Sequence, residues 1–162
     1  MLLKYIDTIR VRLNSLLDVC MELGSLVSNS NSLKKLKIGL VAVNRNNKVL
    51  LIKEKLNRIN KSIYNLPTID IDNLEEKDII NKFNKEYNFK IDKLFGYVNE
   101  VNVLDDKCER VEQINLYTKI NDNMCDSNQI VLRDLNTIEE NDLIPENVKN
   151  TLEIFNYNKE VI

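Results

Sequence analysis

The sequence predicts an α/β fold in which helices pack on a mixed sheet, preceded by one long N-terminal helix. Three observations predict it: a helical repeat of apolar residues between Asn73 and Asn88, short apolar runs separated by polar turns on both sides of it, and a regular apolar seam near the start of the chain. The chain has 162 residues, enough for one sizeable core. We therefore expect a helix and polar hinge over residues 1–32, and a single globular domain over residues 33–162.

The N-terminal helix is expected over residues 1–28, followed by a polar hinge at residues 28–32. Its apolar residues alternate at spacings of four and three, which forms a heptad seam. The seam consists of Leu2, Ile6, Ile9, Leu13, Leu16, Cys20, Leu23 and Val27. A helix of this kind either forms a homodimer with a second copy or packs on its own domain. A seam of under about four heptads leaves both open.

A β-hairpin is expected next, with strands at residues 36–43 and 49–53 and a polar turn at residues 45–48. Residues 55–62 are basic and polar, which is typical of a loop. A short strand-like segment, residues 63–66, then ends at a proline.

The central helix is expected to follow a polar loop that runs from Pro67 to Asn73. Asn73 can cap this helix, and Glu76, three residues later, would complete a capping box. The apolar face of the helix consists of Ile79, Ile80, Phe83 and Tyr87. Asn88 is expected to end the helix, because asparagine tolerates the left-handed backbone conformation of a C-cap. An apolar strand is expected directly afterwards.

The rest of the chain indicates three more strands and a closing helix. The strands are expected at residues 94–103, 111–120 and 130–135. In the second of these, the apolar residues do not keep one phase: they are Val111, Ile114, Leu116 and Ile120. Pro145 is expected in the first turn of the closing helix, whose apolar stripe is Val148, Leu152 and Phe155.

The composition excludes several classes of function. The chain has no histidine, which excludes Ser-His-Asp and Cys-His catalysis and histidine-ligated zinc. The formal net charge is −2 without a basic stripe, so no nucleic-acid partner is expected. The odd number of widely spaced cysteines (Cys20, Cys108 and Cys125) favours reduced thiols inside a cell. Charged residues interrupt the N-terminal segment, so we expect a cytoplasmic protein without a signal peptide or a membrane partner.

The stretch from Tyr64 to Phe89 resembles the signature of the Nudix hydrolases, which act on nucleoside-diphosphate-linked substrates. That signature reads G-x5-E-x7-R-E-U-x-E-E-x-G-U, where U is aliphatic, and W-x-L-P-G usually precedes it. Here Tyr64-Asn65-Leu66-Pro67 is similar to the lead-in, and Lys85-Glu86-Tyr87-Asn88-Phe89 is similar to the end. The differences are Thr68 and Ile69 where the family has glycines, Asn81-Lys82 for the R-E pair, and Lys85 for the first glutamate of E-E.

In the family, glutamates at helix positions i, i+3 and i+4 hold Mg²⁺, and the resemblance assigns these positions to Lys82, Lys85 and Glu86. Each close contact of a lysine with a dication costs several kcal/mol at an effective dielectric of about 20. We therefore expect no magnesium cofactor and no conventional hydrolytic centre, with Glu86 as a weak metal ligand only. A second acidic set, Asp72, Glu75 and Glu76, has the same i, i+3 and i+4 spacing and would offer another metal site if the helix began earlier. The simpler account is that acids at a helix start complement the helix dipole.

The resemblance implies a site at which Lys82, Lys85, Glu86 and Lys53 bind the diphosphate of a nucleotide without cleaving it. No catalytic residue is assigned. The plainer alternative is that Lys82 and Lys85 are solvated lysines of a helix surface. Two other functions stay open: an interaction or scaffold protein with a vestigial pocket, and an active Nudix pyrophosphohydrolase that uses Mg²⁺.

Overall fold

The computed structural model describes residues 36–56, 61–121, 129–136 and 143–159. The expected N-terminal helix, its hinge and its dimer seam lie outside these residues. The elements are β1 (Leu36–Val43), β2 (Lys48–Leu56), β3 (Lys61–Asn65), β4 (Thr68–Ile71), α3 (Glu76–Tyr87), β5 (Gly96–Leu104), β6 (Arg110–Lys119), β7 (Ile130–Asp134) and α4 (Glu146–Asn158). Within the described residues, no helix is long and apolar enough to cross a membrane.

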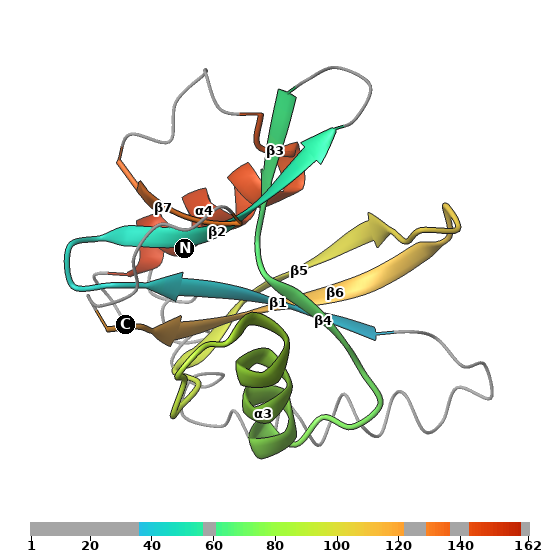
Figure 1. The fold of residues 1–162 in the computed structure, drawn as a ribbon, viewed down its shortest axis with the longest axis horizontal. Helices are drawn as coiled ribbons and strands as arrows, with labels where there is room; N and C mark the ends of the chain where they lie inside the picture. The colour runs from blue at the N-terminus through green and yellow to red at the C-terminus, as the bar shows by residue number, and fades with distance from the viewer. Residues whose placement is uncertain (1–35, 57–60, 122–128, 137–142, 160–162) are drawn as a thin grey trace, which may run out of the picture.

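The strands form one mixed sheet, as predicted. Its main path runs in the order β3-β2-β1-β6-β5, while β4 pairs with β1 and β7 pairs with β2. The β1–β6 pair is parallel and the other pairs are antiparallel. In Figure 1, α3 lies on the near face of the sheet and α4 on the far face. The predicted α/β fold is therefore confirmed, with three layers in the order helix, sheet, helix.

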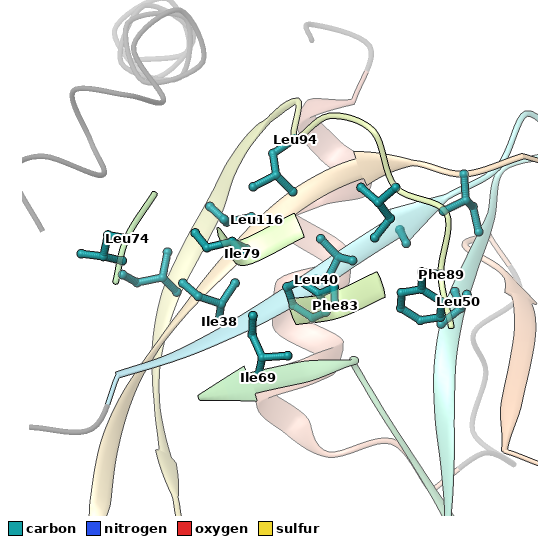
Figure 2. Close-up of a cluster of buried hydrophobic side chains, with 14 of the residues drawn as sticks. Ile38, Leu40, Leu50, Ile69, Leu74, Ile79, Phe83, Phe89, Leu94 and Leu116 are labelled. Atoms are coloured by element: carbon teal, nitrogen blue, oxygen red, sulfur yellow. The ribbon is translucent and has the colours of Figure 1, made fainter. Parts of the chain in front are cut away.

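The core between α3 and the sheet is built by alternate residues of β1. Leu36, Ile38, Leu40 and Ala42 face this side, because successive side chains of a strand point to opposite faces. They pack with Ile79 and Phe83 of α3, both fully buried (Figure 2). Ile79 and Phe83 lie on the apolar helix face that the spacing predicted.

A second core fills the space between α4 and the sheet. Val41 and Val43 of β1 face it, and it also holds the predicted α4 stripe of Val148, Leu152 and Phe155. Strand β6 contributes to both cores, because Ile114 and Leu116 face α3 whereas Tyr117 packs against Phe155, with ring centroids 4.7 Å apart. The loss of phase along β6 is thus the pattern of a strand that is buried on both faces.

The predicted capping box of α3 is wrong. The N-cap is Glu75, and its side chain makes no capping hydrogen bond. Asn73 Oδ1 instead accepts from the Glu75 backbone N–H (3.2 Å), which closes a local turn and delays the helix start. Glu76 Oε1 accepts from the Leu94 N–H (3.0 Å). At the other end, Asn88 has φ 57° and ψ 37°, so the predicted left-handed C-cap is confirmed.

Three other expected boundaries also differ. Residues 68–71 form a strand, not a loop, because they pair with β1 and bury Ile69. The expected loop at residues 55–62 contains the ends of β2 and β3, which pair through Lys55 and Ser62. Residues 89–95 do not form a strand, although Phe89, Ile91 and Leu94 are buried in the core.

The closing helix begins one residue later than the sequence suggested. Pro145 is its N-cap, not part of its first turn. The Pro145 carbonyl accepts hydrogen bonds from the backbone N–H groups of Val148 and Lys149, at 3.0 Å each. Proline is suited to this flanking position as well, because it has no N–H that would need a partner.

Candidate functional site

A cavity of about 480 Å³ is lined by residues of β1 to β6, of the last turn of α3 and of the first turn of α4. Figure 1 shows that the β2–β3 hairpin and the β5–β6 hairpin, which both contribute to this lining, diverge from each other. One part of its lining is apolar: Ile52, Leu66, Val103, Leu104, Pro145 and Val148. The other part is polar: Lys37, Glu54, Asn65, Thr68, Tyr87, Asn102, Gln113 and Asn147. This size lies within the range of sites for small organic ligands.

Helix α3 meets this cavity through Tyr87, at its last turn. The Tyr87 hydroxyl donates to the Thr68 carbonyl (2.7 Å) and accepts from the Thr68 N–H (3.0 Å), which attaches the helix to β4. Burial raises the pKa of Tyr87, and the nearby carboxylates of Glu86 and Glu54 add to the rise. Tyr87 therefore stays a neutral hydroxyl that can hold both bonds.

A second link between α3 and β4 is made by Lys82. Its Nζ donates to the backbone carbonyl of Asp70, and the Asp70 carboxylate lies 3.5 Å from Lys37 Nζ. The side chain of Lys37 is about one quarter exposed and lines the cavity. The Lys82 ammonium thus binds the backbone of β4, while Lys37 lies at the cavity wall.

Three of the four predicted site residues lie together on α3, whereas the fourth, Lys53, lies on β2. Lys82 lies about one turn before the adjacent Lys85 and Glu86 in α3, where Lys82 is partly exposed and the other two are exposed. None of the three lines the cavity. Lys53 does not line it either: its neighbours Ile52 and Glu54 do, and alternation along β2 turns Lys53 to the opposite face.

The residues present do not fit a magnesium ion. Mg²⁺ needs oxygen ligands, mainly carboxylates, whereas Lys82 and Lys85 offer two ammonium groups beside Glu86. The Lys82 ammonium also donates to the backbone carbonyl of Asp70. Across the described ranges, no group of three or more acidic, cysteine or histidine side chains could hold a metal ion.

Sequence reasoning missed the polar cluster beneath the cavity. Gln113, Asn115 and Thr151 are at most 5% exposed, and they are joined to Asn99 by hydrogen bonds between side chains. Gln113 also lines the cavity. The available signal was the pair of amides at positions 113 and 115, which interrupts the apolar residues of the strand.

Solved structures with the same fold were found at low sequence identity. The MutT protein of Methanosarcina mazei has a TM-score of 0.61 and 14% identity, over 78% of this chain and 95% of that one. A Nudix-family hydrolase of Clostridium perfringens has a TM-score of 0.55 and 13% identity, over 75% and 96%. An ADP compounds hydrolase has a TM-score of 0.56 and 13% identity, over 80% and 76%.

No protein-family sequence model matches the chain, and no curated protein sequence is significantly similar to it. The structural matches show that the chain has the fold of the Nudix hydrolases, so the family resemblance of residues 64–89 is confirmed at the level of the fold.

Proposed function

We propose that this protein binds a nucleotide diphosphate in the cavity beside α3 and does not hydrolyse it by a magnesium-dependent reaction. The observation that carries the proposal is the charge next to the cavity. Lys37 lines its wall, and α3, whose Tyr87 reaches the cavity edge, carries Lys82 and Lys85 on the turns before Tyr87. These lysines stand where the Nudix resemblance would place glutamates that hold metal.

The chemistry of the cavity supports a nucleotide. A nucleobase and ribose need apolar surface for the rings together with a few polar groups, and the lining supplies both. Lysine is a compact cation that suits phosphate oxygens, so ammonium groups can offset the charge of a diphosphate without a metal. The exposed ammonium of Lys85 has no partner that would have to be displaced among the described residues.

Calorimetric titration with ADP and with ADP-ribose in the presence of a chelator tests this proposal, followed by chromatography of the ligand after incubation with Mg²⁺. We expect heat of binding with the chelator present and an intact ligand afterwards. Lys85→Gln should weaken binding, whereas Lys77→Gln, an exposed lysine in the first turn of the same helix, should not. An absence of heat with either ligand overturns the proposal.

The same experiment separates the two other functions. Release of phosphate-containing products that depends on Mg²⁺ would indicate an active hydrolase. No binding and no turnover, together with a dimer that is lost when residues 1–28 are deleted, would indicate a scaffold protein. The homodimer and the cytoplasmic location stay predictions.

A further inference from the structure

The polar cluster beneath the cavity is arranged in two neighbouring rows across the sheet. In the first row, Gly39 of β1, Asn115 of β6 and Asn99 of β5 are direct register partners. In the next row, Lys37 of β1 pairs with Gln113 of β6. The first row is covered by α4, whereas Lys37 and Gln113 both line the cavity.

The direction of each hydrogen bond in this cluster is set from α4. Thr151 Oγ1 lies 2.8 Å from the Asn147 backbone carbonyl, which can only accept, so the hydroxyl proton of Thr151 points there. The hydroxyl must then accept from its other partners. These are Asn99 Nδ2 at 3.1 Å and Asn115 Nδ2 at 3.2 Å. Both amides therefore turn their NH₂ groups towards Thr151.

The orientation of Asn115 in turn fixes that of Gln113, which lines the cavity. Asn115 Nδ2 also donates to Asn99 Oδ1 (2.8 Å), so Asn115 Oδ1 is left to accept from Gln113 Nε2 (2.8 Å). Gln113 is then held with Nε2 towards the core. The alternative orientation of Gln113 would place two amide oxygens against each other, which costs free energy in a buried site.

Gln113 Oε1 is the end of this chain of hydrogen bonds. It accepts no hydrogen bond from any described residue. It is also not sealed in the core, since Asn156 Oδ1 is the buried side-chain atom without a partner in the described ranges. Because Gln113 lines the cavity, this oxygen is an acceptor of fixed orientation at the cavity wall, and its register partner Lys37 lines the same cavity.

We infer that Gln113 Oε1 recognises a nucleobase edge that carries an N–H donor, the edge pattern of a base with an exocyclic amino group. The adenine edge, with its 6-amino group next to N1, has this pattern, and so does the cytosine edge. The inference rests on the proposed function and specifies its ligand: a base with an exocyclic amino group binds, and the same base without that group binds more weakly.

Two ligands that differ in one group test this inference: ADP, and the 5′-diphosphate of purine riboside, which has hydrogen in place of the 6-amino group. Their dissociation constants are measured by calorimetry in the presence of a chelator. We expect ADP to bind about tenfold more tightly, because the analogue leaves a desolvated amide oxygen without a donor. Gln113→Met should bring the ratio of the two constants close to one. Glu112→Met, at an exposed position on the other face of the same strand, should leave the ratio unchanged.

The outcomes separate the inference from the proposed function. If neither diphosphate binds, both are overturned. If both bind equally well to the unaltered protein, or if the ratio survives Gln113→Met, the inference is overturned and the proposed function stands. A second pair of variants covers the case in which Gln113→Met does not fold: Thr151→Ser keeps the hydroxyl that orients the amides and should keep the ratio. Thr151→Val removes that hydroxyl and should lower the ratio at least about threefold; an unchanged ratio in Thr151→Val overturns the inference.

Discussion

Replacing Gly39 with alanine should destabilise the protein strongly, although Gly39 lies in a strand, where alanine is ordinarily the better residue. An added Cβ would lie 2.0 Å from Asn115 Oδ1, 2.6 Å from Gln113 Nε2 and 3.2 Å from Asn115 Cγ. Asn115 is fully buried and cannot swing into solvent. The methyl group fits only if the Asn115 side chain leaves its position.

The cost can be worked out from the bonds that Asn115 would lose. Its side chain makes three hydrogen bonds, to Gln113, Asn99 and Thr151. At about 1 kcal/mol net for each bond, their loss amounts to about 3 kcal/mol. Because the Asn115 side chain leaves its position, the overpacking cost of about 1–3 kcal/mol is relieved and does not add to this loss, so the total effect should be about 3 kcal/mol. For a domain of this size, that corresponds to a fall in the melting temperature of about 10 °C.

Unfolding in urea measures this effect, and a double-mutant cycle locates its cause. In an Asn115→Ala background the clash with the amide oxygen is absent, so Gly39→Ala should cost at least about 1.5 kcal/mol less than in the unaltered protein. The reasoning is refuted if Gly39→Ala changes the free energy of unfolding by under about 0.5 kcal/mol, or if its cost is the same in both backgrounds.

Three further predictions concern the C-terminal end of α3 and its charged face. Tyr87→Phe removes two hydrogen bonds to β4 and should lower the free energy of unfolding by about 1–3 kcal/mol at neutral pH. Burial raises the pKa of Tyr87 and of Tyr117 above 10.0, so their contribution to the free energy of unfolding is fully present below pH 10 and is lost as the pH rises through the folded-state pKa values. Tyr87→Phe should therefore make the free energy of unfolding, measured in urea at alkaline pH, fall less steeply. An equally steep fall would contradict the raised pKa of Tyr87. Asn88→Ala should lower the free energy of unfolding by about 1 kcal/mol, because alanine is strained at the Asn88 φ of 57°, whereas Asn88→Gly should leave it unchanged or raise it. A higher melting temperature for Asn88→Ala than for Asn88→Gly would be inconsistent with the left-handed C-cap. Lys82→Glu with Lys85→Glu restores three carboxylates on one helix face, so Mg²⁺ should raise the melting temperature of this variant by a few degrees but not that of the unaltered protein; the same rise in both would disprove the charge argument.

The elements that the sequence predicted best are those fixed by local pattern. The apolar spacing around Ile79 and Phe83 defines a helix face without reference to the rest of the chain, and Asn88 ends the helix through its own backbone preference. Strand β4 was missed because Thr68–Ile71 is only four residues long and is stabilised mainly by pairing with β1, which sequence spacing does not reveal. The capping box failed because Asn73 forms a tighter local turn with its own neighbours.

The candidate site was less predictable than the fold because its parts come from separate elements. Lys37, Tyr87 and Gln113 meet at one cavity although they belong to β1, α3 and β6. The family resemblance assigned the lysines of α3 to the site, which stays a prediction, and the role given to Lys53 required knowledge of which face of β2 it occupies. The amides of β6 acquire their meaning only from their partners on β5 and α4.

The central claim is that ammonium groups take the place of a metal beside the cavity. Its most direct test is a titration of the purified protein with ADP-ribose in a chelator, followed by analysis of the ligand after Mg²⁺ is supplied. The account predicts saturable binding without metal and an unchanged ligand afterwards. Cleavage of the pyrophosphate bond that stops with chelator, and that is abolished by Glu86→Gln, would contradict it.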